Sequence, residues 1–380
     1  MTKRVAEFKS RRTVSPGKGR VNRLVQGVLL AAMLLGLPLL GLAVIGQPIS
    51  PYLQFPPETR LVDQPPFSWP FFALIAMLLF ALVVPFLVWC ILSAPSRVSF
   101  KRGWRPFPWW GSVGLALTGV AWVLSWNRFD WFAWGQPFIF PGLWFGFILV
   151  INGLTFMRSG RCMLLDQPAR FGLLFPVSAV FWWFFEYLNR FVQNWAYLQV
   201  DHFSPLEYVI YASISFSTVL PAVLGTRDFL ATFPFFDRFF NDVLPIQPAR
   251  PEVLSVALLC LSGAGLALIG VWPNVLFPLV WVAPLVIIVT SQTLLGEGHV
   301  LSSVTTGNWR PVVTAALAAL ICGFFWEMWN FYSLTKWVYS IPYVQRFHVF
   351  EMPILGYGGY LPFGLECAII GEWVLGRKRR

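Results

Sequence analysis

The sequence predicts an all-α polytopic membrane protein with about ten transmembrane helices. Hydrophobic residues make up 57% of the 380 residues and charged residues only 12%, and apolar runs of about twenty residues recur throughout. A soluble domain cannot bury that many such runs, whereas a bilayer core about 30 Å thick requires helices of about that length. A polar motif also occurs twice, which predicts two parallel four-helix repeats after two N-terminal helices.

Ten segments have the length and composition of a span. They are residues 24–45, 69–93, 109–126, 138–157, 171–190, 206–224, 253–271, 275–295, 311–331 and 352–375. The first follows a basic segment, but no small-residue cleavage site comes after it, so we interpret it as an uncleaved helix. The aromatic segment 229–245 is too interrupted to span and is expected to lie at the cytoplasmic interface.

The distribution of Lys and Arg predicts the orientation in the membrane. With these spans, the outer loops hold only Arg60, Arg128, Arg190, Lys336 and Arg346 of the 28 basic residues. Positively charged loops stay in the cytoplasm, so both termini are predicted to be cytoplasmic, in a bacterial-type plasma (inner) membrane. The net charge of +11 is therefore attributed to topology and to anionic lipid heads, with no nucleic-acid partner.

The repeat defines the domain organisation. Trp134, Pro141 and Trp144 recur as Trp272, Pro278 and Trp281. An even number of spans in each unit makes the two copies parallel. The predicted units are a basic tail (1–23), two N-terminal helices (24–104), repeat 1 (105–225), an interfacial linker (226–247), repeat 2 (248–376) and a second basic tail (377–380).

The polar motif holds the candidate functional residues. Each copy has Glu-x-x-Asn, then Trp-x-Tyr, a His and a second Glu. The residues are Glu186, Asn189, Trp195, Tyr197, His202 and Glu207 in the first copy, and Glu327, Asn330, Trp337, Tyr339, His348 and Glu351 in the second. Counting 1.5 Å per residue from Arg170 and Arg310 places the leading acids in the outer third of the membrane.

Two interpretations of these acids remain open. Intramembrane carboxyls are costly to insert and usually functional or paired, and one held in a low-dielectric site can stay protonated and act as an acid. Alternatively, Glu-x-x-Asn near a helix end can simply bond a neighbouring helix, while Trp and Tyr supply an interfacial belt. Survival of the whole set in both copies favours a site.

The motif resembles that of the integral-membrane lycopene cyclases, which are built from two tandem helical repeats. The family pattern is an acid, then Trp-x-Tyr nine residues on, then a Pro-x-Glu-Glu element. The matching residues are Glu186, Trp195-Ala-Tyr197 and Ser204-Pro205-Leu206-Glu207, and more loosely Glu327, Trp337-Val-Tyr339 and Phe350-Glu351-Met352-Pro353. Tyr208 and Met352 stand in place of the second Glu.

The resemblance implies a cyclase or isomerase that acts on a carotenoid or another isoprenoid lipid without a cofactor. Glu186 or Glu327 would protonate a double bond, with Glu207 and Glu351 as bases or orienting partners. Asn189 and Asn330 would belong to the same catalytic set. The Trp-x-Tyr aromatic faces would bind the apolar substrate and stabilise a carbocation.

Two other function classes remain as alternatives. Duplicated halves with interfacial acids are typical of proton-coupled transporters of a small or lipid-like substrate. Glu, His and Glu in each copy could also form a metal-dependent enzyme through His202 and His348, although no strong metal-ligand spacing is present. Glu366, deep in the last span, is expected to be paired structurally.

Overall fold

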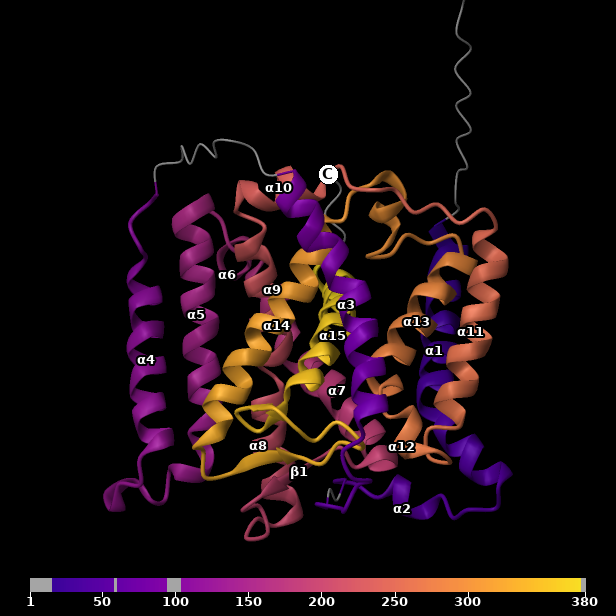
Figure 1. The fold of residues 1–380 in the computed structure, drawn as a ribbon. Helices are drawn as coiled ribbons and strands as arrows, with labels where there is room; N and C mark the ends of the chain where they lie inside the picture. Colours follow the sequence, from indigo (N-terminus) through magenta and orange to yellow (C-terminus); the bar gives the residue numbers. More distant parts are fainter. Residues whose placement is uncertain (1–15, 58–59, 94–103, 377–380) are drawn as a thin grey trace, which may run out of the picture.

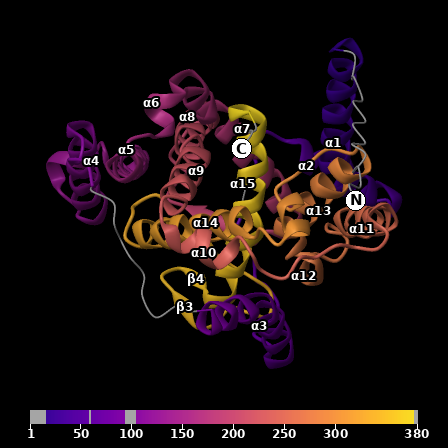
Figure 2. The ribbon, with the colours of Figure 1, turned by 90° about the horizontal axis from the view of Figure 1, so that it is seen from above.

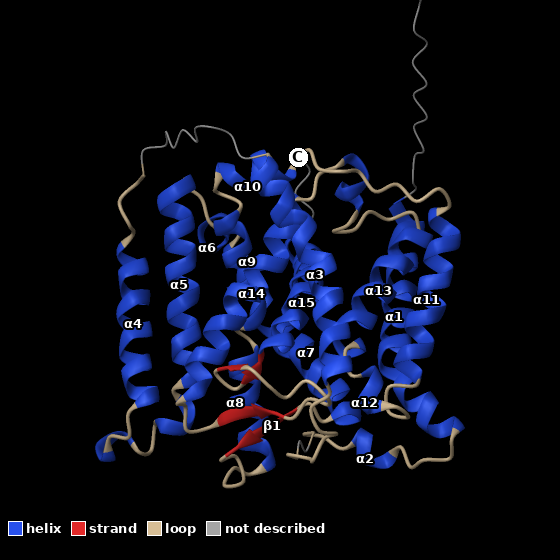
Figure 3. Ribbon diagram, viewed as in Figure 1, coloured by secondary structure: helices blue, strands red, loops and turns tan. Residues whose placement is uncertain are grey.

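The computed structural model describes residues 16–57, 60–93 and 104–376. Long helices run roughly side by side, and two short strand pairs lie together at one end of the bundle (Figures 1 and 3). We call this the strand end and the other the opposite end. The C-terminus lies at the opposite end (Figure 1).

The first part of the chain is helical up to the first strand. Its elements are α1 (Pro16–Val44), α2 (Ser50–Leu53), α3 (Trp69–Leu92), α4 (Trp109–Trp126), η1 (Asp130–Phe132), η2 (Gln136–Phe138), α5 (Phe140–Ser159), α6 (Met163–Asp166) and α7 (Pro168–Val192). The central part runs from the first strand to the last short helix before α14. It comprises β1 (Trp195–Leu198), α8 (Pro205–Phe216), α9 (Val219–Leu230), α10 (Pro234–Phe240), α11 (Pro251–Ala267), α12 (Pro273–Leu276), α13 (Leu279–Leu294) and η3 (Ser302–Thr306).

The last part supplies the second copy of the motif. It comprises α14 (Arg310–Phe331), β2 (Lys336–Tyr339), β3 (His348–Val349), β4 (Met352–Pro353), η4 (Ile354–Gly359) and α15 (Tyr360–Leu375).

Seven helical segments in the described residues are long and apolar enough to cross a membrane. Two more apolar helices, α11 and α13, are shorter. A multi-pass helical protein in a lipid bilayer follows from these lengths and compositions.

The helices depart from the predicted spans where local chemistry interrupts them. The span expected at 206–224 is two helices, α8 and α9, which together extend to Leu230. At the break the Thr218 hydroxyl donates to the Ser215 carbonyl at 2.7 Å, and Pro221 has no N–H to donate to the helix ladder. The span expected at 275–295 is likewise divided into α12 and α13 before Pro278, and the one at 352–375 begins as η4.

Two other expectations need correction. The tail predicted to extend to residue 23 is already helical from Pro16, while residues 1–15 and 377–380 lie outside the described part. The 229–245 segment contains α10, which lies at the opposite end of the bundle (Figure 1) with Phe236, Phe239 and Phe240 buried in the core. Finally, the fold includes two antiparallel strand pairs, β1–β2 and β3–β4, that an all-α prediction omits.

Corresponding helices of the two predicted repeats pack in corresponding pairs. Helix α4 packs on α5 as α11 packs on α13, and α5 packs on α9 as α13 packs on α15. Helix α9 also contacts α14, and α15 contacts α7, so that each half packs against the other in the middle of the molecule (Figure 2). The close approach of α14 and α15 requires Gly364, because a Cβ there would lie 2.8 Å from the Ala315 carbonyl carbon.

Candidate functional site: two buried glutamates beside an apolar cavity

The two Trp-x-Tyr motifs pair with each other. Strand β1 is antiparallel to β2, with Trp195 opposite Tyr339 and Tyr197 opposite Trp337. Each Trp therefore faces the Tyr of the other copy, which is the register expected for two equivalent segments related by a local two-fold axis. The two Trp-x-Tyr segments thus form a single structural unit at the strand end of the bundle (Figure 3).

The two asparagines hold these strands on their helices. Asn189 is fully buried; its Oδ1 accepts from the Asn194 backbone N–H at 2.8 Å, and its Nδ2 donates to the Trp195 carbonyl at 2.8 Å. Asn330, also fully buried, accepts from the Trp337 N–H at 2.9 Å and donates to the Trp337 carbonyl at 2.7 Å. Both predicted catalytic amides are thus committed to the backbone, where they position each Trp-x-Tyr.

The carboxyl of Glu186 lies one turn before Asn189 and has no exposed surface. Its Oε1 accepts hydrogen bonds from the Tyr197 hydroxyl at 2.6 Å, the Trp182 indole at 3.0 Å and the Trp195 indole at 3.1 Å. Its Oε2 is buried and has no hydrogen-bond partner among the described residues. The local sequence thus brings the acid and the Trp-x-Tyr of one copy into direct contact.

The carboxyl of Glu327 is held in a related way. Its Oε1 accepts from the Tyr339 hydroxyl at 2.7 Å and from the Tyr360 hydroxyl at 2.8 Å, and its Oε2 is also buried without a partner among the described residues. The Trp337 indole donates to the Tyr339 hydroxyl at 3.0 Å instead of to the acid. One glutamate is therefore held by a phenol and two indoles, and the other by two phenols.

The strand tyrosines are neutral donors. Burial raises the pKa of Tyr197 well above its usual value, and the neighbouring Glu186 carboxyl raises this pKa further. Burial and Glu327 act in the same direction on the pKa of Tyr339. Both hydroxyls therefore keep their protons across the physiological pH range.

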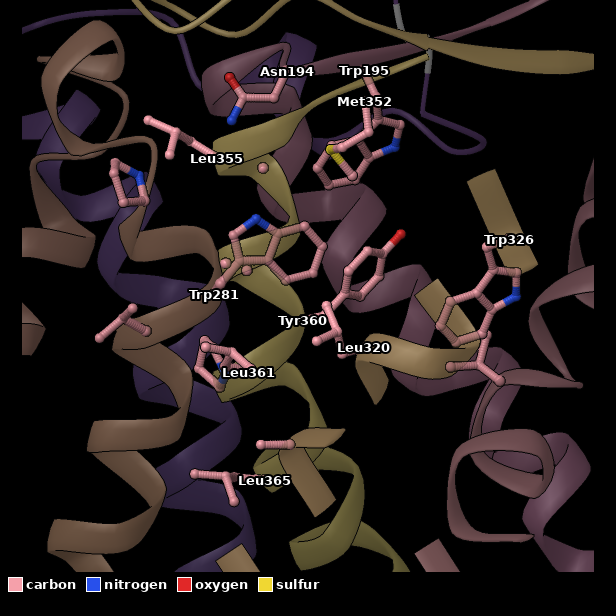
Figure 4. A pocket seen from close by; sticks show the side chains of 18 of the residues that line it. Asn194, Trp195, Trp281, Leu320, Trp326, Met352, Leu355, Tyr360, Leu361 and Leu365 are labelled. Carbon is pink, nitrogen blue, oxygen red and sulfur yellow. The ribbon is translucent and has the colours of Figure 1, made fainter. Parts of the chain in front are cut away.

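A cavity of about 920 Å³ lies beside this unit, a volume within the range of ligand pockets. Its wall includes the aromatic side chains that bind the two acids, Trp182, Trp195, Tyr197, Tyr339 and Tyr360, and also Trp337. Figure 4 shows Trp281, Trp326 and Tyr360 around the same space, with Asn194 at one end and Leu365 toward the other. Neither Glu186 nor Glu327 is part of the wall, so each acid lies behind its own tyrosine.

Helix α3 forms one side of the cavity. Its lining residues form a single stripe at helical spacing, Ile75, Leu78, Leu79, Leu82, Val83, Phe86, Leu87 and Cys90. The stripe is about 22 Å long at 1.5 Å per residue. None of the residues of α3 is buried. Hydrogen bonds hold its two ends, from Ser68 N–H to the Tyr343 carbonyl and from the Trp89 indole to the Phe239 carbonyl.

The second predicted acid of each copy has a partner elsewhere. Glu207 is exposed and forms a capping box with Ser204, whose hydroxyl donates to Glu207 at 2.8 Å. Glu351 forms an ion pair with Lys336. Neither lines the cavity, so the geometry brings the leading acids to the site but gives the following acids structural partners.

The histidines are not gathered into a metal site within the described residues, which contain no cluster of three or more His, Cys, Asp or Glu side chains. His202 and His348 are both exposed. Glu366 is 1% exposed, and neither carboxyl oxygen has a hydrogen-bond partner among the described residues, so the structural pairing expected for it is not found.

Several residues of the site carry no signal in the sequence. Trp182 and Tyr360 bind the acids, yet they belong to no repeated motif, and in the sequence Trp281 is only one of the residues that recur between the two copies. Their relation to the acids depends on how α7, α13 and α15 pack, which spacing along the chain does not reveal.

Comparison of the chain with protein-family models, with curated proteins and with solved structures finds no match.

Proposed function

We propose that this protein is a membrane-embedded acid–base cyclase or isomerase that acts on an apolar isoprenoid lipid. The observation that carries the proposal is the pair of buried acids, each bound by a tyrosine hydroxyl whose ring lines one apolar cavity. An acid kept away from water can protonate a substrate in the membrane, and the aromatic rings of the wall can stabilise the carbocation that forms. The resemblance to the lycopene cyclases supports the same chemistry.

In the proposed reaction one Glu–Tyr pair gives a proton and the other accepts one. For the reaction the Glu–Tyr hydrogen bond reverses, so that the protonated carboxyl donates to the Tyr oxygen while the Tyr hydroxyl gives its proton to a carbon of a terminal double bond. This step forms a C–H bond and a carbocation and leaves a carboxylate and a neutral Tyr. A second double bond attacks the cation and closes a ring. A proton then leaves a neighbouring carbon for the opposite pair, so the product is an isomer of the substrate and no redox cofactor takes part.

The same proposal includes about ten membrane spans, which are two N-terminal helices followed by two parallel four-helix repeats, with both termini in the cytoplasm of a bacterial-type cell. The matched helix pairs and the β1–β2 register support the repeat. The basic residues at the opposite end, including Arg158, Arg170 and Arg310, support the orientation. In this orientation the strand end lies on the outer side of the membrane. The two acids near it are then in the outer third of the membrane, as expected.

The test uses membranes containing the full chain, incubated with a panel of neutral isoprenoids that begins with lycopene. We expect cyclised product from the wild type. Glu186→Gln and Glu327→Gln should each lower turnover about 10²-fold or more, because the amide cannot donate the proton. Glu207→Gln, at the exposed capping box, is the matched control and should retain activity. Folded wild-type protein that converts no member of the panel would overturn the proposal.

A proton-coupled carrier of a lipid-like substrate is the second candidate, because the cavity runs from Tyr339 at the strand end to Trp309 and Phe240 near the opposite end. A carrier would move an unchanged lipid across vesicle membranes in response to a pH gradient. Product analysis of the same vesicles separates the two functions, since only the enzyme alters the lipid.

A further inference from the structure

The chemistry of the cavity wall restricts the ligand, and this inference rests on the proposed function because it defines the substrate of the same site. No Lys, Arg, His, Asp or Glu occurs among the described residues that line the cavity. A phosphate or ammonium group buried there would have no partner of opposite charge, which is strongly unfavourable in a low-dielectric medium. The ligand therefore enters the cavity as a neutral molecule.

Most polar groups of the wall already have protein partners. The Tyr197, Tyr339 and Tyr360 hydroxyls bind the two acids. The Thr335 hydroxyl donates to the Pro137 carbonyl at 3.0 Å, and the Ser215 hydroxyl donates to the Tyr211 carbonyl at 3.1 Å. Besides the Tyr208 and Tyr211 hydroxyls, which also line the cavity, these groups bond the buried acids or backbone carbonyls and offer little to a ligand.

Asn194 differs from them. It is 3% exposed and lines the cavity, and its Oδ1 is buried without a hydrogen-bond partner among the described residues. Figure 4 shows its amide nitrogen on the side of the other labelled side chains, at the end of the cavity next to Trp195. No hydrogen bond from this nitrogen is found among the described residues. A donor left unpaired at an apolar cavity is costly, which points to a ligand oxygen that accepts from it.

The position of Asn194 in the repeat makes it specific to one half of the molecule. Its own backbone is fixed independently, because its N–H donates to Asn189 Oδ1 and its carbonyl accepts from the Ser340 N–H. Lys336 takes the equivalent place before Trp337 in the second copy, but it forms an ion pair with Glu351 and does not line the cavity. The cavity thus has one uncommitted amide and hence two chemically different ends.

We propose that the substrate is a long, neutral isoprenoid with an oxygen function at one end, and that Asn194 receives this oxygen. A terminal hydroxyl fits, because its oxygen can accept from the amide nitrogen that faces the cavity (Figure 4). The apolar chain then extends from Asn194 along the stripe of α3 and past the hydroxyls of the two Glu–Tyr pairs. Asn194 is accordingly a substrate-positioning residue at the strand end of the cavity.

The test measures the binding of three probes to the full chain in detergent. Quenching of tryptophan fluorescence reports the binding. The probes are the C20 alcohol geranylgeraniol, the hydrocarbon with hydrogen in place of its hydroxyl, and geranylgeranyl diphosphate. We expect the alcohol to bind about 5- to 10-fold more tightly than the hydrocarbon, as one hydrogen bond would give. The diphosphate should bind least.

Two variants identify the residue responsible. Asn194→Leu should bind the hydrocarbon as the wild type does and lose the preference for the alcohol. Ser215→Ala removes a hydroxyl elsewhere in the cavity and should keep that preference. Equal binding of alcohol and hydrocarbon by the wild type, a preference that survives in Asn194→Leu, or tightest binding of the diphosphate would each overturn the inference. Because binding is read without turnover, failure here leaves the acid–base reaction to be judged by its own product analysis.

Discussion

Replacing Asn189 or Asn330 with leucine is expected to release the β1–β2 pair from the helices that hold it. Asn330→Leu leaves the Trp337 N–H and carbonyl without their side-chain partners, and Asn189→Leu does the same for groups of Asn194 and Trp195. At about 1–3 kcal/mol for each buried group left unsatisfied, the free energy of unfolding should fall by about 2–6 kcal/mol. Thermal unfolding in detergent, followed by tryptophan fluorescence, measures this.

Asn127→Leu is the matched control for this stability effect. Asn127 is exposed and donates to the Val123 carbonyl at 2.7 Å, so the same substitution should change the free energy of unfolding by less than about 0.5 kcal/mol. If Asn189→Leu and Asn330→Leu unfold at the temperature of this control, the two asparagines do not position the Trp-x-Tyr segments.

Tyr197→Phe and Tyr339→Phe should each lower turnover about 10²-fold while the chain stays folded. In each half the phenol hydroxyl lies between the carboxyl and the cavity, at 2.6 Å from Glu186 or 2.7 Å from Glu327. Phenylalanine keeps the ring and its contacts with the substrate but cannot pass a proton, and loss of a positioned proton donor costs 10²–10⁴-fold. The measurement is the initial rate of product formation with the isoprenoid that gives most product.

The control for the tyrosine variants is Tyr211→Phe. Tyr211 also lines the cavity, and its ring stacks on Phe138 with centroids 4.1 Å apart, but its hydroxyl is not bonded to either acid. This variant should retain the wild-type rate. Full activity in both Tyr197→Phe and Tyr339→Phe would show that protons do not pass through these hydroxyls.

The sequence predicts well those residues of the site that lie close together along the chain. Glu186, Asn189, Trp195 and Tyr197 lie within one helix turn and the following strand, so chain connectivity alone brings them together. Their repetition in a second copy marks them as a unit. Helical periodicity and apolar length likewise predict a bundle of membrane helices, because the bilayer imposes both.

The rest depends on packing between distant segments. Residues of β1 and β2 that face each other are far apart in the sequence, and a four-residue strand gives no periodic signal among aromatic helices. Tyr360 reaches Glu327 only because η4 ends where α15 begins to pack on α14. Asn194 directly precedes Trp195, but its place in the cavity wall depends on how distant helices enclose that space.

The central claim is that the reaction adds one proton to an isoprenoid and removes another. Its most direct test is to run the wild-type reaction in D₂O and determine the mass of the product. Acid–base isomerisation predicts a product that has the substrate's mass when formed in H₂O and carries one deuterium when formed in D₂O. A product that has gained or lost two hydrogens, or gained oxygen, would contradict the account.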